Sequence, residues 1–172
     1  MFLVKSKQEK KAKKLKSLSY DSTPNYSFFG KTFLSKVLDV SGPDSLTVTI
    51  KINDIYYKIN CKLNGICTPN LNSPDTYEED AANLTKKYLF YLLTKQKIST
   101  DCPDKLIRKI CYEVNSIVLI NCYHFDQDNN LLIDVISDDV YINNKLILDG
   151  YALSCKSDNK PVWNTYFKPV TF

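Results

Sequence analysis

Arginine is almost missing from this chain. Arg108 is the only arginine among 172 residues, although the lysines bring the basic total to 23. Lysine supplies positive charge, but it lacks the planar fork of N–H donors that grips a phosphate at two points. A site built on two arginines is therefore excluded. The chain also has only four glycines and no phosphate-cradling glycine loop, which excludes the common nucleotide-hydrolase motifs.

Histidine is equally scarce, because His124 is the only one. It lies two residues from Cys122 and two from Asp126, and neighbours at that spacing on a strand stand side by side. We therefore interpret His124 as a strand or barrel-rim residue and not as part of a Cys-His-Asp catalytic group.

The six cysteines are scattered singly and form no Cys-x-x-Cys pair, so the spacing of a zinc site is missing. We expect no metal centre and no cofactor. We interpret the cysteines as reduced and mostly buried thiols. They are Cys61, Cys67, Cys102, Cys111, Cys122 and Cys155.

No apolar run approaches the roughly 20 residues that span a bilayer. The opening MFLV is followed by lysines and does not resemble a secretory signal. We therefore expect no membrane span, and an intracellular, reducing location. With 44% hydrophobic residues, the chain has enough apolar material for one domain with its own core.

Positive charge is concentrated at the start of the chain. Residues 1–16 hold seven lysines and Glu9, a net charge of +6, whereas the whole chain carries +4 and residues 17–172 therefore carry −2. We expect residues 1–29 to be a basic arm and linker, with the arm disordered or helical only on a partner. The arm either contacts nucleic acid or an acidic protein, or only solubilises the chain. Its lysines are Lys5, Lys7, Lys10, Lys11, Lys13, Lys14 and Lys16.

The middle of the chain alternates apolar and polar residues, as strands do. We expect strands over residues 31–40, 45–52, 55–63, 114–125 and 130–137, with a turn region around Pro103 before the fourth. Asp75 or Thr76 begins one main helix that runs to about Gln96, and its apolar residues recur at helical spacing. A short helix over residues 143–153 begins at Asn143 and ends near Gly150. Five strands with the main helix between strands 3 and 4 predict an α+β fold with an OB-type barrel.

Three strings in this order resemble the staphylococcal-nuclease-like (thermonuclease) domain, specifically the compact versions found in large DNA viruses. They are VLDVSGPDSLTV, KLNGICTPN and INNKLILDGYAL, and the resemblance covers residues 30–160. It implies an OB-type barrel and, in active members, a calcium-dependent phosphodiesterase. Such an enzyme uses acids to hold the cation, a glutamate to orient water and two arginines to stabilise the phosphate.

The residues at the matched positions differ from that set. Asp44 matches the first acid and Thr68 keeps a usable carbonyl, but Cys67 and Asn70 stand where the family has aspartate and glutamate. Lys62 and Asn130 replace the two arginines. We therefore expect a vestigial pocket without catalytic residues, although Asp75, Glu78 or Glu79 follow the loop closely enough to be tested as substitutes.

The prediction is a catalytically inactive OB-fold module. It serves either as a structural part of an assembly, such as a virus particle, or as a nucleic-acid-binding protein; the alternative is an active calcium-dependent phosphodiesterase. Besides the arm, we expect partners to bind an aromatic tail, residues 161–172, through Trp163, Tyr166 and Phe167, which have no periodic helix to bury them.

Overall fold

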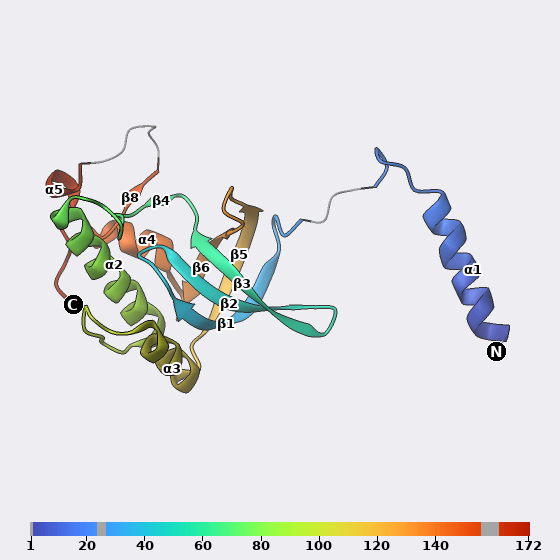
Figure 1. The fold of residues 1–172 in the computed structure, drawn as a ribbon, viewed down its shortest axis with the longest axis horizontal. Coiled ribbons are helices and arrows are strands. Elements are labelled where there is room, and N and C mark those ends of the chain that lie inside the picture. Colours follow the sequence, from blue (N-terminus) through green and yellow to red (C-terminus); the bar gives the residue numbers. More distant parts are fainter. Residues whose placement is uncertain (1, 24–26, 156–161) are drawn as a thin grey trace.

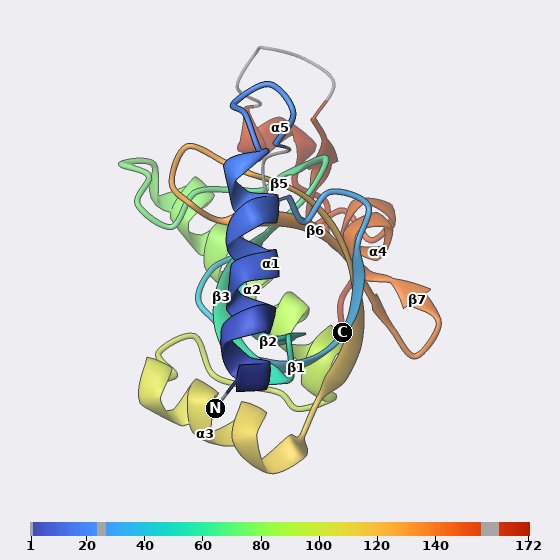
Figure 2. The same ribbon diagram turned by 90° about the vertical axis from the view of Figure 1, so that its right-hand side faces the viewer.

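The computed structural model describes residues 2–23, 27–155 and 162–172, with only the backbone described for residues 2–6. Its centre is a closed five-stranded barrel (Figures 1 and 2). The strands follow the order β3-β2-β1-β5-β6, and a parallel pairing of β3 with β6 closes the ring. They are β1 (Thr32–Val40), β2 (Ser45–Ile52), β3 (Ile55–Leu63), β5 (Ile117–Phe125) and β6 (Leu131–Ser137). The predicted OB-type barrel in an α+β fold is thereby confirmed.

Alternating burial along the strands explains why these segments form a barrel. On β6 the side chains of Leu131, Ile133 and Val135 are fully buried, while the residues between them are only partly buried. The hairpin between β2 and β3 turns at Asn53 and Asp54, which both adopt positive φ angles of 49° and 68°. Two such residues in succession match the right-handed twist of the flanking strands.

Helix α2 (Thr76–Thr94) lies between β3 and β5, as expected for the main helix. Asp75 is its N-cap, because its Oδ1 accepts a hydrogen bond from the Tyr77 backbone N–H at 3.0 Å. The predicted apolar stripe consists of Ala81, Leu84, Tyr88 and Tyr91 or Leu92. Ala81, Tyr88 and Leu92 are buried, and Leu84 and Tyr91 are partly buried against the core. The stripe therefore packs into the core.

Helix α3 (Asp104–Val114) occupies the segment in which the sequence suggested only a turn region, and it takes Val114 from the predicted strand. Pro103 precedes its first turn. Ile107 and Cys111, four residues apart, are fully buried, so α3 packs one narrow face against the barrel, with β1 as its main contact. Ile107, Ile110, Cys111 and Val114 recur at spacings of three and four, so the helical period was present in the sequence although only a turn region was predicted.

Helix α1 (Phe2–Lys16) corrects the expectation of an arm that is disordered without a partner. Lysine, alanine, glutamine and glutamate all favour helix, which explains the conformation. In Figure 1 the helix lies apart from the barrel, beyond a connecting segment. The side chains described along it, from Lys7 to Lys16, are all exposed.

The short helix α4 (Ile142–Leu148) follows the two-residue strand β7 (Val140–Tyr141), close to the predicted place. Asn143 does not cap it, because Tyr141 holds the N-cap position. Instead the buried Asn143 side chain joins chain segments: its Oδ1 accepts from Val135 N at 3.0 Å, and its Nδ2 donates to Asn64 O at 3.0 Å. Among the described helices, none has the length and apolarity that a bilayer crossing requires.

The C-terminal segment is part of the core and not a free aromatic tail. Trp163, at the start of α5 (Trp163–Tyr166), is 4% exposed, and Phe167 is also buried. Only Tyr166, 54% exposed, matches the expectation of an accessible anchor. Helix α5 contacts α2, and this long-range packing buries residues that have no local pattern of their own. The boundary expected between residues 160 and 161 lies outside the described residues.

A disulfide joins Cys67 to Cys155, which corrects the expectation of six reduced thiols. Cys67 belongs to β4 (Ile66–Cys67), and β4 pairs with β8 (Leu153–Ser154). This pairing brings the two cysteine Cα atoms within 5.4 Å, although 88 residues separate them in sequence. The other four cysteines are free, and Cys61, Cys111 and Cys122 are buried as predicted.

Candidate functional site

A hollow of about 320 Å³ lies between the β1–β2 turn and the loop after β4, where the sequence predicts a vestigial pocket. Asp44 and Lys62 line it from the turn and from β3, while Thr68 and Asn70 line it from the loop. Four of the six residues named from the sequence are thus brought together. The register explains part of this, since Ser45 at the start of β2 pairs with Lys62 near the end of β3.

Asp44 is buried and already has partners on both carboxylate oxygens. Its Oδ1 accepts a hydrogen bond from Ser45 Oγ at 2.8 Å. Its Oδ2 lies 3.6 Å from Lys62 Nζ, in an ion pair. Because this lysine neutralises the only carboxylate of the pocket lining, the pocket has no net charge to attract either a cation or a phosphate.

The loop from Thr68 to Ser73 is held by Glu78 on α2. The Glu78 Oε1 accepts from the Asn70 backbone N–H at 3.1 Å, and Oε2 accepts from Ser73 Oγ at 2.7 Å. The Asn70 side chain turns back to accept from Asn72 N at 3.0 Å. Glu78 therefore fixes the loop, and both its oxygens are engaged away from the role of a catalytic base.

The other two acids considered as substitutes for a catalytic glutamate, Asp75 and Glu79, lie outside the pocket. Asp75 caps α2, and Glu79 is exposed on its first turn. Neither residue is among those that line the pocket. The sequence left open whether one of the three acids replaces the missing glutamate; for Asp75 and Glu78 the structure shows a structural use of the carboxylate.

Cys67 and Asn130 do not line the pocket. The Cys67 sulfur is in the disulfide. Asn130 closes the turn between β5 and β6, where its backbone N–H donates to Asp126 Oδ1 at 2.8 Å and its Nδ2 donates to Oδ2 at 3.2 Å. Partial burial alone would raise the pKa of Asp126. The two hydrogen bonds from Asn130, a third from Asp128 N and the positive charge of Lys62 outweigh this effect, so the pKa lies below its ordinary value.

A calcium ion, which the family resemblance implies for active members, does not fit this pocket. Calcium requires six to eight oxygen ligands, several of them anionic. The lining offers one carboxylate that is paired with a lysine, and the cysteine that stands at the other aspartate position has no oxygen to contribute. Among the described residues, no three histidine, cysteine, aspartate or glutamate side chains gather into a metal-binding group.

Arg108 serves the packing of α3 and not the pocket. Its Nε lies 2.8 Å from Asp39 Oδ2, and this bond joins the helix to β1. The carboxyl of Asp39 is buried, and its Oδ1 has no hydrogen-bond partner among the described residues. Cys122, the thiol nearest to His124 in sequence, faces the core, and burial raises its pKa to about 11, so it is no nucleophile at neutral pH.

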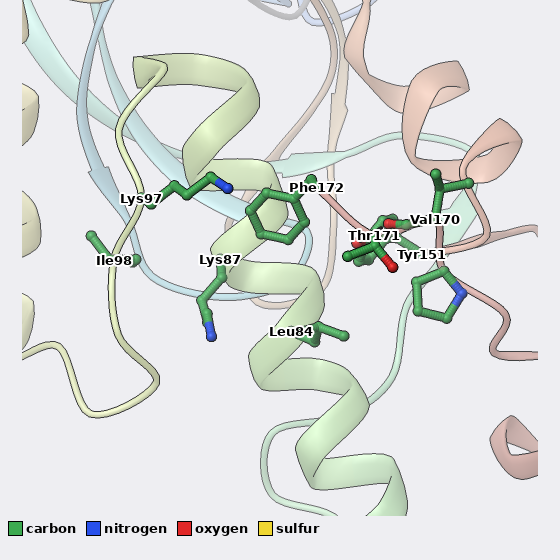
Figure 3. A pocket seen from close by; sticks show the side chains of 9 residues that line it. Leu84, Lys87, Lys97, Ile98, Tyr151, Val170, Thr171 and Phe172 are labelled. Atoms are coloured by element: carbon green, nitrogen blue, oxygen red, sulfur yellow. Dashed lines mark hydrogen bonds between the residues drawn. The ribbon is translucent and has the colours of Figure 1, made fainter.

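A second cavity, of about 290 Å³, lies between α2, the segment after it and the C-terminal residues (Figure 3). Its wall is mostly apolar, and Phe172 packs its ring 4.9 Å from that of Tyr88. Lys97 holds its ammonium group 5.6 Å from the Phe172 ring centre. In Figure 3 Lys87 points away from this ring. Sequence reasoning missed this cavity, because α2 and the segment after it form it together with Tyr151 and residues 169–172, which are distant in the chain.

No protein-family model and no curated protein sequence matches this chain. The fold is established by the barrel topology. The likeness to staphylococcal-nuclease-like domains stays a prediction from the three sequence strings.

Proposed function

We propose that this chain is a non-catalytic binding module on a nuclease-like OB barrel, and that helix α1 is its contact for nucleic acid. The observation that carries the proposal is that, among the described residues, unpaired positive charge is concentrated on α1 and not in the barrel pocket. The lysines of α1 from Lys7 onward are exposed and have few acids among them, whereas Lys62 in the barrel pocket is paired with Asp44. The barrel thus supplies the scaffold, and the helix supplies the charge.

The pocket geometry supports the absence of catalysis. Phosphodiester hydrolysis needs preorganised charge around the reacting phosphate, and removing one such donor typically lowers the rate by about a hundredfold to a thousandfold. Here the single arginine is bonded to Asp39, and the nearest buried glutamate fixes a loop. Even if these effects are far from additive, too little transition-state stabilisation remains for useful turnover.

The composition of α1 favours nucleic acid over a protein groove. A groove that accepts a helix reads apolar anchors spaced along one face, yet after Phe2, Leu3 and Val4 at its start α1 has only Ala12 and Leu15 as apolar residues. A phosphate backbone requires only positive charge, because the released counterions supply most of the affinity. Glu9 is the only acid in this helix, so almost nothing offsets the lysines.

The binding experiment measures the affinity of the full chain for a labelled oligonucleotide as a function of salt. We expect affinity that is independent of sequence and falls steeply with salt. Replacing Lys10, Lys11, Lys13 and Lys14 by glutamine should reduce both the affinity and the salt dependence. The logarithmic slope should fall by roughly 0.9 for each phosphate of duplex DNA that the variant no longer neutralises. The matched control replaces four exposed lysines of the barrel and α3, namely Lys51, Lys58, Lys105 and Lys109, and should change the affinity much less.

Two results would contradict the proposal. The first is a chain that ignores nucleic acid at physiological salt, or that binds equally well without the α1 lysines. The second is calcium-dependent cleavage of nucleic acid by the wild-type chain that disappears in Asp44→Ala, because the pocket would then be an active site.

A structural role in an assembly, for example a virus particle, is the second candidate. It is favoured by the end of the β2–β3 hairpin, where Ile55, Tyr56 and Tyr57 are exposed together, and by the slightly acidic charge of residues 17–172. In that case the chain without residues 1–16 would fail to enter the assembly, while the free full-length chain would not bind nucleic acid at physiological salt.

A further inference from the structure

The outer wall of the barrel carries a row of apolar side chains that crosses four strands. Leu34 on β1 is paired with Leu119 on β5, Leu119 with Ile136 on β6, and Ile136 with Tyr141 on β7. Residues paired directly across strands point to the same face of a sheet. The alternate residues Val118, Ile120 and Val135 are buried in the core, so the row faces outward.

This row and Ile117 beside it form what we term the outer-face patch: Leu34, Ile117, Leu119, Ile136 and Tyr141. Leu34 is 72% exposed, and Tyr141 and Ile117 are 53% and 52% exposed. The exposed apolar area is on the order of 400 Å², a size at which a patch on a soluble protein marks an interaction site. The solvent-facing side of an antiparallel sheet ordinarily carries polar residues, so this wall is built to be covered.

The charges beside the patch are arranged with opposite signs at its two ends. At the β1 end, Lys36 is paired in register with Ile117. Its Nζ donates to Asn115 Oδ1 at 2.6 Å and to Tyr112 O at 3.3 Å and lies 4.7 Å from the Tyr112 ring centre, but it forms no ion pair within the described part of the chain. At the β7 end, Asp139 is exposed and likewise has no ion pair with the described residues.

We propose that the outer-face patch is the interface between two copies of this chain. A twofold axis parallel to the strands and lying in the interface turns the row end for end. It places Leu34 of one copy over Tyr141 of the other, and Lys36 over Asp139, in both directions at once. A self-complementary pattern of this kind is what an isologous dimer requires, whereas one unlike partner would have to match both ends separately.

The available area is in keeping with such a dimer. Each partner of a standard interface contributes roughly 800 Å², of which somewhat more than half is apolar. The patch supplies about that apolar share, and the polar residues around it supply the rim. In Figure 2 the strand β7 lies outside the ring of five strands, so it extends the wall beyond the curve of the barrel and enlarges the surface available to a second copy.

The experiment measures the mass of the full chain by sedimentation velocity over a wide range of concentrations, with circular dichroism to verify folding of each variant. We expect a species of twice 19.8 kDa at high concentration. Leu34→Lys should raise the dimer dissociation constant roughly tenfold or more, since it places a charge against the Tyr141 ring of the other copy in a desolvated contact. The control is Leu148→Lys, because Leu148 is 80% exposed on α4 and outside the patch; it should leave the dissociation constant unchanged.

The orientation is tested separately with Lys36→Gln and Asp139→Asn, since asparagine tolerates the positive φ of 62° at that position. Each variant should weaken the dimer, and the second substitution should add little to the first, because the two residues form one contact. A wild-type chain that stays monomeric at every concentration overturns the proposal, as does a Leu34→Lys variant that dimerises like Leu148→Lys. Fully additive effects of Lys36→Gln and Asp139→Asn overturn the twofold arrangement.

Discussion

Truncation of Trp163 tests whether the C-terminal segment belongs to the folded core. Trp163→Ala removes an indole that is 4% exposed and lies on α5 against α2. Removing a buried aromatic side chain costs about 3–5 kcal/mol, because the transfer free energy of the deleted atoms adds to the cavity left behind. A domain of this size is stable by only about 5–15 kcal/mol in total. The melting temperature should therefore fall by on the order of 10 °C.

The measurement is thermal and urea unfolding followed by far-ultraviolet circular dichroism, which does not depend on the deleted tryptophan. The matched control is Tyr166→Ala, three residues along the same short helix, where the ring is 54% exposed. Its effect should stay within about 0.5 kcal/mol. Equal effects of the two substitutions, or a Trp163→Ala variant as stable as wild type, would refute the assignment of this segment to the core.

Tryptophan emission adds an independent readout in the wild-type chain. Trp163 is the only tryptophan, so its fluorescence reports on this segment alone. If the segment is part of one cooperative unit, the red shift of its emission and the decay of circular dichroism should occur at the same urea concentration. An earlier emission change would show that residues 162–172 detach before the barrel unfolds.

Two further predictions concern the cysteines. Cys155→Ser opens an 88-residue covalent loop and should lower the free energy of unfolding by about 2–4 kcal/mol. Reducing the wild-type chain with dithiothreitol should have the same effect. A wild-type stability that does not change with dithiothreitol would contradict the disulfide. The second prediction concerns the pKa values of the buried thiols, which burial raises from the ordinary value of 9.0. The pKa of Cys61 rises to about 12, with a smaller contribution from Cys122, and the pKa values of Cys111 and Cys122 rise to about 11. The folded state holds these protons more tightly than the unfolded state. The free energy of unfolding is therefore unaffected below about pH 9 and falls as the pH rises towards 11. For each thiol the fall is up to about 1.4 kcal/mol per pH unit. Urea unfolding at about pH 8 and pH 10 measures the fall, and Cys122→Ala should reduce its slope; an unchanged slope would contradict the assignment.

Several features of the fold were predictable because they depend on neighbours in the sequence. The five strands followed from period-two alternation, and the cap of α2 followed from Asp75 before a helical apolar pattern. Helix α3 was missed although Ile107, Ile110 and Cys111 recur at helical spacing and pack toward the core. The period of α3 was therefore readable from the sequence, and only its packing against β1 required the tertiary structure.

The position of the candidate site was predictable from the sequence, but the hydrogen bonds and the ion pair of its residues were not. The residues Asp44, Lys62, Thr68 and Asn70 were placed together correctly. Their hydrogen bonds were not foreseeable, because the partner of Lys62 depends on the hairpin register and the anchor of Asn70 lies on a different element, at Glu78. Sequence distance is no guide to such interactions.

By itself, the sequence determined the strand and helix periods, the single arginine and the concentration of lysine before the barrel. These are properties of composition and of local spacing, which any fold must respect. The tertiary structure alone decided that Cys67 meets Cys155, that Trp163 is buried and that Leu34, Leu119, Ile136 and Tyr141 line up across four strands. Each of these depends on the register and closure of the barrel, which bring together residues that no local pattern connects.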